Sequence, residues 1–297
     1  MKRVCITLIT SFILFSCMSG ANKSFALGQQ GHQIVCQLAF NNLNHRQQQS
    51  LQNWVAQISP RHKSQINHRL HRDKNATLTF SDACVWADAI RHIDTYKPFS
   101  TWHYVNVERD DLRATGFGCP RGCIIQAMIT HDQQWRENRP VTDRLEALLF
   151  LSHWFGDIHQ PLHVSFQSDR GGNDTLVIDS ANKCTNLHQV WDTCLVRDIA
   201  MTDQQWQIRF VDYQKSQNLE FIDQLRLPTV VSWANESLFI TRNPRLQYCH
   251  TQGGNWCYPV AGDIFYNRHY IEQNKHLLQQ QILLSALRLR AYLAATL

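Results

Sequence analysis

Two His-x-x-x-Asp units constrain this chain more than any other feature of its sequence. His153 and Asp157 lie four residues apart, and so do His188 and Asp192. In a helix this spacing places both side chains on one face, one turn apart, so that an imidazole and a carboxylate can bind the same metal ion. His153 also follows the apolar residues 149–151, and a buried His–Asp pair is costly unless it is hydrogen-bonded or metal-bound. A core hydrogen bond explains one such pair, but two pairs indicate a metal site.

Three other segments carry side chains of the same kind. His163 follows a proline that must end the first helical unit, and Asp88 lies among apolar residues three positions before Arg91. His103 lies in the aromatic run at residues 102–106. Taken alone, each segment is more typical of ordinary packing. Together with the two helical units they form a set of His and Asp ligands suited to zinc.

The fold class follows from the spacing of apolar residues. Helical spacing dominates, and only residues 102–107 and 175–178 have strand-like composition. No linker, low-complexity tract or repeat interrupts the chain. We therefore predict a mainly α fold, a single-domain helical bundle with minor short β elements. The expected helices are residues 31–43, a segment from Ser81-Asp82 to before Lys97-Pro98, a long helix from Thr142-Asp143 to Pro161, residues 187–199, and a final amphipathic stretch over residues 261–297.

The N-terminal segment has the pattern of an export signal. A basic start at residues 2–3 precedes an apolar run over residues 5–15, which is shorter than the roughly 20 residues of a membrane span. The segment ends in a small-x-small pattern, Ser-Phe-Ala, so we predict a cleaved signal peptide over residues 1–26. Residues 27–297 would form a single catalytic domain in a secreted or periplasmic protein that has no membrane partner. A lipoprotein site at Cys17 is the weaker alternative.

The cysteines and the net charge limit the functional class further. Eight of the ten cysteines follow the signal peptide, and an oxidising compartment favours disulfides over zinc ligation, the alternative use. The plausible pairs are Cys119/Cys123, Cys249/Cys257 and Cys184/Cys194, which leaves Cys36 and Cys84 for each other, although eight cysteines allow 105 pairings. Removal of the signal lowers the formal charge from +5 to +2, with 26 basic and 24 acidic side chains left. A protein that holds nucleic acid through a large basic surface is therefore excluded.

With these motifs the sequence resembles the zinc-dependent type I nucleases, which are single-strand-specific nucleases and 3′-nucleotidases of fungi, plants and bacteria. The resemblance covers nearly the whole mature chain in order. Its motifs are GH at 31–32, WADAIR at 86–91, WHY at 102–104, HWFGDIHQPLHV at 153–164, GGND at 171–174 and NLHQVWD at 186–192.

The resemblance implies three zinc ions in a cleft. It assigns the first zinc to Asp88, His103, His153 and Asp157, and the second to His163, His188 and Asp192. The third zinc falls to His32, Asp157 and the α-amine and carbonyl of the mature N-terminal residue, which is Leu27 here. The family usually has Trp at that position. Leucine supplies the same backbone atoms, but it loses the aromatic packing.

The resemblance also implies an activity. The expected reaction is endonucleolytic hydrolysis of single-stranded DNA and RNA to 5′-phosphate products, with 3′-nucleotidase activity, by a monomer that has no stable protein partner. Asp88 would orient the attacking water and Arg91 would hold the phosphate. Tyr104 and Asn106 would stack on and contact a base, which favours unpaired strands. Three zinc ions and three aspartates leave a charge near +3, which attracts the phosphodiester.

Several alternatives remain open at the level of sequence. Tyr104 can be a core residue, and Arg91 can make an ordinary surface salt bridge. A zinc-dependent phospholipase C has similar ligands but needs an apolar mouth for lipid chains. A non-catalytic zinc or nucleic-acid binding protein is the third candidate, although structural zinc sites are usually closed and Cys-rich.

Overall fold

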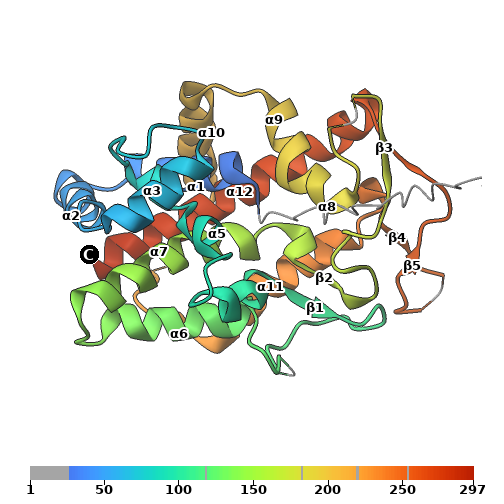
Figure 1. Ribbon diagram of the computed structural model, residues 1–297. Coiled ribbons are helices and arrows are strands. Elements are labelled where there is room, and N and C mark those ends of the chain that lie inside the picture. The colour runs from blue at the N-terminus through green and yellow to red at the C-terminus, as the bar shows by residue number, and fades with distance from the viewer. Residues whose placement is uncertain (1–26, 118, 182, 219–220, 253) are drawn as a thin grey trace, which may run out of the picture.

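The computed structural model describes residues 27–297 except positions 118, 182, 219–220 and 253 (Figure 1). The predicted signal peptide, residues 1–26, lies outside the described residues. The helices are α1 (Gln29–Asn41), α2 (His45–Val55), α3 (Pro60–Arg69), α4 (Phe80–Ala83), α5 (Trp86–Ile90), α6 (Ile124–Arg136), α7 (Val141–Ile158), α8 (Leu187–Gln189), α9 (Leu195–Ile199), α10 (Asp203–Ser216), α11 (Leu227–Thr241) and α12 (Arg268–Thr296). The prediction of a mainly α fold is confirmed.

Strands are few and short in the described part of the chain. They are β1 (Val105–Val107), β2 (Val164–Phe166), β3 (Val177–Asp179), β4 (Cys249–His250), β5 (Tyr258–Pro259) and β6 (Ile264–Tyr266). β1 pairs with β2 and β3 with β6, both parallel, and β4 pairs with β5 antiparallel. Short 3-10 turns are η1 (Lys97–His103), η2 (Pro161–His163), η3 (Gln167–Asp169) and η5 (Pro244–Leu246), and η4 (Val190–Cys194) is a π-helical turn.

Helix α7 forms the centre of the bundle. Every residue from Ala147 to Ile158 is buried, because α1, α5, α6, α11 and α12 pack around it (Figure 1). A helix that is apolar on all sides is stable only when it is enclosed in this way. His153 and Asp157 are therefore set on the most enclosed element of the fold.

Two predicted helix starts are wrong by a few residues. α7 begins at Val141 with Pro140 as its N-cap, and not at Thr142, because proline is preorganised for a helix start and lacks an N–H that the first turn would leave unpaired. The segment expected from Ser81 begins at Phe80, where Thr79 and Asp82 form a capping box. That segment then divides into α4 and α5.

Two further predicted elements differ in kind. Residues 187–199 are helical, but the π turn η4 interrupts them and carries Asp192. The strand expected from residue 102 begins only at Val105, because residues 97–103 form the turn η1. Similarly, the final helix begins at Arg268, after the strand β6.

The disulfide predictions are confirmed. The bonds are Cys36–Cys84, Cys119–Cys123, Cys184–Cys194 and Cys249–Cys257. The first bond ties α1, which carries His32, to the residue after α4. Across the described residues, no helix combines the length and apolar character that crossing a bilayer requires.

Candidate metal centre

His153 and Asp157 face each other across one turn of α7. The carbonyl oxygen of Cys84 can only accept a hydrogen bond, and it lies 2.8 Å from His153 Nδ1, so Nδ1 carries the proton. His153 Nε2 then points toward Asp157 Oδ2 at 3.2 Å. An imidazole oriented by a backbone carbonyl in this way is the usual arrangement of a metal-ligating histidine.

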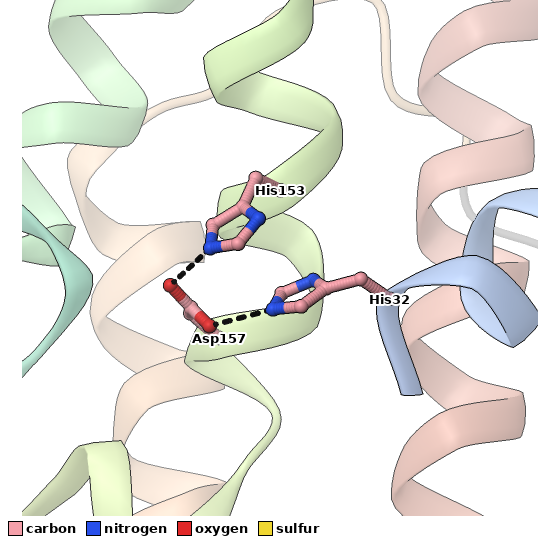
Figure 2. Close-up of side chains that lie close together, drawn as sticks. All are labelled: His32, His153 and Asp157. Atoms are coloured by element: carbon pink, nitrogen blue, oxygen red, sulfur yellow. Dashed lines mark ion pairs between the residues drawn. The ribbon is translucent and has the colours of Figure 1, made fainter. Parts of the chain in front are cut away.

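His32 of α1 approaches Asp157 from the other side. Its Nε2 lies 3.2 Å from Asp157 Oδ1, and its ring stacks on that of His153 with centroids 3.7 Å apart (Figure 2). The approach requires Gly156, because a Cβ at this position would lie 2.5 Å from His32 Nδ1. The buried side chain of Leu27 packs against α1 and α7, the helices that carry these two rings. A Cβ at Gly31 of α1 would lie 2.7 Å from Leu27 Cγ.

Asp88 and His103 complete this side of the centre. His103 is the last residue of η1. Its Nδ1 lies 3.0 Å from Asp157 Oδ2 and 4.0 Å from Asp88 Oδ1. Two arginines hold the Asp88 carboxylate: Arg69 Nη2 donates to Oδ2 at 2.8 Å, and Arg91 Nη1 lies 3.6 Å from Oδ1. Two guanidinium groups therefore fix the position of the Asp88 carboxylate.

His163, His188 and Asp192 form a separate group. The Nδ1 atoms of His163 and His188 lie 2.8 and 2.7 Å from the carbonyl oxygens of His103 and Gly171, which leaves both Nε2 atoms directed at Asp192. These Nε2 atoms lie 3.5 and 3.2 Å from the Asp192 carboxylate. Gly171 has φ 66°, and a Cβ there would lie 2.5 Å from a backbone oxygen, so glycine is required.

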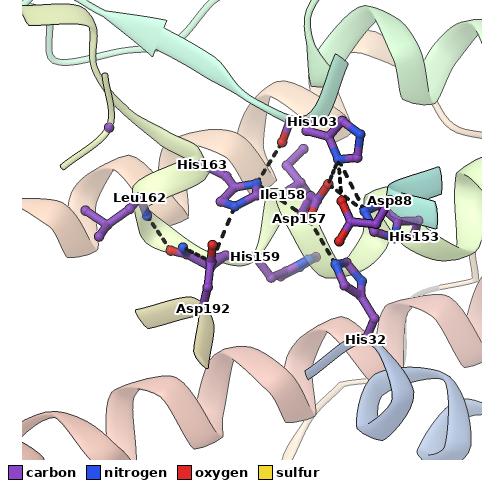
Figure 3. Close-up of polar contacts among 12 residues, drawn as sticks. His32, Asp88, His103, His153, Asp157, Ile158, His159, Leu162, His163 and Asp192 are labelled. Carbon is purple, nitrogen blue, oxygen red and sulfur yellow. Dashed lines mark hydrogen bonds and ion pairs between the residues drawn. The ribbon is translucent and has the colours of Figure 1, made fainter. Parts of the chain in front are cut away.

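The buried side chains thus gather into three groups, each with ligand atoms within 4.8 Å of one another (Figure 3). The groups are His32, His153 and Asp157; Asp88, His103 and His153; and His163, His188 and Asp192. Within the described part of the chain, several of their buried atoms make no hydrogen bond, namely His32 Nε2, Asp88 Oδ1, Asp157 Oδ1, His163 Nε2 and Asp192 Oδ2. Buried polar atoms rarely lack a partner, and these point at one another as metal ligands do.

The electrostatics of the groups also favour bound cations. Burial alone would raise the pKa of Asp157, but the charges of His153 and His163 outweigh burial and hold that pKa well below its usual range. Burial likewise opposes ionisation of Asp192, yet His188 and His163 lower its pKa to about 2. Asp88 shifts in the same direction because His153 and Arg69 lie beside it. Three ionised, fully enclosed carboxylates need compensating positive charge.

Comparison with known proteins places this centre in a family. The S1/P1 nuclease family model matches residues 27–297. The chain belongs to the S1/P1 nuclease family. The resemblance inferred from the motifs is therefore confirmed, and the His/Asp groups together with the family indicate a metal cofactor.

Individual relatives of this S1/P1 nuclease family member are distant. Endonuclease 2 of Arabidopsis thaliana is 29% identical over 208 residues, which cover 65% of this chain and 62% of the relative. Endonuclease 1 of the same plant is 33% identical over 64% of this chain and 58% of its own length. Nuclease S1 of Aspergillus oryzae is 26% identical over 61% of this chain and 58% of its own length. The chain spans less than two thirds of the length of each of these three relatives.

A cleft of about 1240 Å³ opens beside the groups, and Asp88, His103, His163 and His188 line it. Of the other predicted site residues, Arg91, Tyr104 and Asn106 also line it. Arg91 reaches the cleft from the end of α5, where it pairs with Asp88 rather than with a surface carboxylate. Tyr104 is 37% exposed at the cleft wall, so it is not a core residue. The buried Oδ1 of Asn106 faces the same space and makes no hydrogen bond.

The structure adds two residues that the sequence analysis missed. Arg69 of α3 holds Asp88, and Gln160 Nε2 donates to Asp192 Oδ1 at 2.6 Å. Gln160 lies inside the HQPLH motif, and that motif is the sequence signal that could have indicated its role. No sequence pattern indicated a role for Arg69. His159 of the same motif turns away from the groups. Its Nδ1 meets the Phe155 carbonyl, and its Nε2 lies 2.8 Å from Arg288 of α12.

Proposed function

We propose that this protein is a zinc-dependent endonuclease that hydrolyses single-stranded DNA and RNA to 5′-phosphate products and also removes 3′-phosphates from nucleotides. One observation carries the proposal: three adjacent buried groups made only of imidazoles and carboxylates lie beside an open cleft, which is lined by Asp88, His103, His163 and His188. Structural zinc sites are closed and usually rich in cysteine, whereas every cysteine in the described chain is in a disulfide. Membership of the S1/P1 nuclease family supports the choice of reaction.

The proposed zinc ligands follow the three groups. Asp88, His103, His153 and Asp157 would hold the first zinc, and His163, His188 and Asp192 the second. His32, Asp157 and the backbone of Leu27 would hold the third. Each oxygen of Asp157 faces a different histidine, which supports a bridging role. Leu27 lies buried beside His32, which supports its part once cleavage after Ala26 frees its amine.

Bound zinc supplies Lewis-acid chemistry, since it acidifies water and neutralises phosphate charge. The side chains of this chain provide orientation. Asp88, held by Arg69 and Arg91, presents a fixed carboxylate oxygen that can align a water molecule with the phosphorus atom. Arg91 lies in the cleft beside that oxygen, where its guanidinium can bind the phosphate.

Base contacts in the proposed complex are few. Tyr104 exposes its ring at the cleft wall, and Asn106 offers an amide nearby. Stacking on a tyrosine accepts any base but requires the base to be unstacked from a duplex. This requirement supports a preference for single strands. The four disulfides support a secreted or periplasmic location, and we propose that the protein acts there as a monomer.

The test uses purified mature protein with zinc and circular single-stranded DNA. We expect linear and shorter products with 5′-phosphate ends, loss of activity in a chelator, and little cutting of relaxed duplex DNA. Release of phosphate from a 3′-nucleotide tests the second activity. Diacylglycerol released from phosphatidylcholine without any cutting of DNA would instead identify a phospholipase C. An oligonucleotide bound tightly but left intact would identify a binding protein.

A further inference from the structure

The two ends of the cleft differ in chemistry. At one end, the last turn of α3 and the end of α5 contribute His68, Arg69, His71, Arg91 and His92. We call these five residues the basic wall. α3 and α5 pack together, and Figure 1 shows them on the left, separated from β1, β2 and α8 on the right. The basic wall is therefore a continuous surface formed by two adjacent helix ends.

The opposite end of the cleft carries no such charge. Its lining includes Tyr104, Asn106, Asn173, Leu176 and Asn186, which are neutral. Arg170 also lines the cleft, but its guanidinium pairs with Asp174. Among the described residues that line the cleft, Asp88 is the only carboxylate, and it is already bound by two arginines. The cleft thus has a cationic, donor-rich wall facing a wall of amides, an aromatic ring and an aliphatic side chain.

The backbone fixes the exposed part of the basic wall. His71 has φ 54°, a left-handed conformation that is strained for a non-glycine residue. The buried Asn67 holds the turn that follows, because its side chain donates to the carbonyls of Lys74 and Ala76 at 3.2 and 2.8 Å and accepts from Arg72 at 3.0 Å. His71 is therefore presented toward the cleft by a turn that is anchored in the core.

Arg69 connects the basic wall to the reaction site. Its Nη2 lies 2.8 Å from Asp88 Oδ2, so the guanidinium adjoins a proposed zinc ligand. A guanidinium has five N–H donors in a planar fork, and imidazoles donate N–H bonds in either protonation state. Such donors match the oxygens of phosphate groups. Contacts of this kind do not distinguish one base from another.

We propose that the basic wall binds the phosphates of the substrate strand next to the phosphodiester that is cut, so that the bases lie toward the neutral wall. The proposal rests on the function proposed above and adds an orientation and a length preference to it. A strand of several nucleotides can use the wall, whereas a 3′-nucleotide has only the phosphate at the metal centre. Longer substrates should therefore bind more tightly.

The test uses a triple variant, His68→Gln, His71→Gly and His92→Gln, in the zinc-loaded protein. These side chains are exposed, and glycine relieves the left-handed strain at position 71, so the variant should fold. Arg69 and Arg91 are left in place because their loss would also disturb Asp88. The matched control is His45→Gln with His276→Gln, two exposed histidines that do not line the cleft.

We expect the triple variant to raise KM several-fold for an oligothymidylate while kcat is nearly kept, and to change KM for a 3′-nucleotide much less. The control should match the wild type on both substrates. Equal loss on the two substrates would overturn the proposal, because it would mean that the wall acts on the metal centre. An oligothymidylate KM equal to that of the control would also overturn it.

Binding is measured separately, so that failure of the proposed function can be distinguished. The probe is a fluorescent oligothymidylate with phosphorothioate linkages, which resists hydrolysis, and its anisotropy is followed as protein is added. We expect the dissociation constant of the triple variant to be several-fold higher than that of the control, because three imidazole donors to phosphate oxygens are lost. A dissociation constant equal to that of the control would contradict the wall even in a protein with nuclease activity. A higher dissociation constant would support the wall even in a protein that cuts nothing. Binding to anionic lipid vesicles that the triple variant loses would overturn the proposal.

Discussion

At the scale of single residues, Asp157 links two of the three groups. One oxygen faces His32 at 3.2 Å and the other faces His103 at 3.0 Å, and the residue is wholly enclosed in α7. An amide of the same shape cannot supply two anionic oxygens. The positions of the two oxygens therefore support the proposal that this aspartate bridges two metal ions.

We expect Asp157→Asn to lower nuclease activity at least about 100-fold, because even residues that only support metal ligands change affinity or activity 10- to 100-fold. Metal analysis of the purified variant should give fewer zinc ions per chain. Asp132→Asn is the matched control. This buried aspartate pairs with Tyr292 and Arg136 away from the centre, so its loss should lower stability but keep the zinc. Full activity in Asp157→Asn would refute the bridge.

The residues of the site that sequence could predict are those set by local spacing. His153 with Asp157, and His188 with Asp192, follow from four-residue spacing in helical segments. Arg69 and Gln160 could not be predicted in the same way, because their roles depend on contacts with Asp88 and Asp192, 19 and 32 residues away. Long-range geometry of this kind leaves no periodic trace in the sequence.

At the scale of elements, the limits of prediction lie at helix boundaries. Pro140 and Thr79 act as helix starts, where Thr142 and Ser81 have equally good local chemistry. The π turn η4 is a further case. One extra residue widens the helix at Asp192, and such turns frequently occur at functional sites. The helical pattern of residues 187–199 contains no sign of it.

The turn that supports His188 depends on one buried aspartate. Asp169 accepts hydrogen bonds from Arg109, Tyr248, Thr175 and the Gly172 N–H, at 2.7–3.1 Å. The carbonyl oxygen of Gly171, two residues after Asp169, lies 2.7 Å from His188 Nδ1. The hydrogen bonds of Asp169 thus support the turn that orients His188, a member of the group His163, His188 and Asp192.

We expect Asp169→Asn to lower the free energy of unfolding by about 3 kcal/mol, because it leaves the buried Arg109 without its charged partner. It should also weaken zinc binding by His163, His188 and Asp192, because the turn at Gly171 orients His188. Urea denaturation and metal titration measure the two effects. In Asp174→Asn, which removes the exposed ion pair with Arg170, the change in stability should stay within about 0.5 kcal/mol. Equal effects of the two substitutions would contradict this account.

The packing of α6 on α7 contains a histidine that must stay neutral. His131 is buried, and its ring stacks on Phe150 with centroids 4.5 Å apart. Its Nδ1 lies 2.9 Å from the Ala127 carbonyl oxygen and 3.1 Å from Trp154 Nε1. Burial lowers the pKa of His131 from 6.5 to about 3. At pH values between about 3 and 6.5, the unfolded chain therefore binds a proton on this side chain, whereas the folded chain does not.

It follows that His131 lowers stability as the pH falls from 6.5 toward 3, by about 1.4 kcal/mol per pH unit. We expect His131→Phe, which keeps the ring stacking, to remove this part of the slope while it loses one hydrogen bond to Trp154. The difference between wild type and variant in unfolding free energy, measured by urea at several pH values, should shrink and then reverse on acidification. Parallel curves would show that His131 is protonated in the folded protein.

At the scale of the whole molecule, the proposed third zinc site would depend on where a signal peptide is cut. Three segments far apart in sequence, α1, η1 and α7, meet at Asp157, and the disulfide Cys36–Cys84 ties α1 to the residue after α4. The start of the described chain, Leu27, lies buried against this junction with Gly28 close to the backbone of Asp192. Processing of the N-terminus would therefore complete a site that the folded bundle has already assembled.

We expect one residue added before Leu27 to lower the zinc content from three ions to two, because the third zinc needs the free α-amine at that position. Gly156→Ala should remove the same ion from the opposite side, since its Cβ would meet His32 Nδ1. Gly254→Ala is the control, because nothing lies within 4 Å of its added Cβ. The other two ions should stay in all three proteins, as counted by atomic absorption after N-terminal sequencing. Three zinc ions in the extended protein would refute ligation by the terminus, and the leucine would then serve only to pack against the His32 helix.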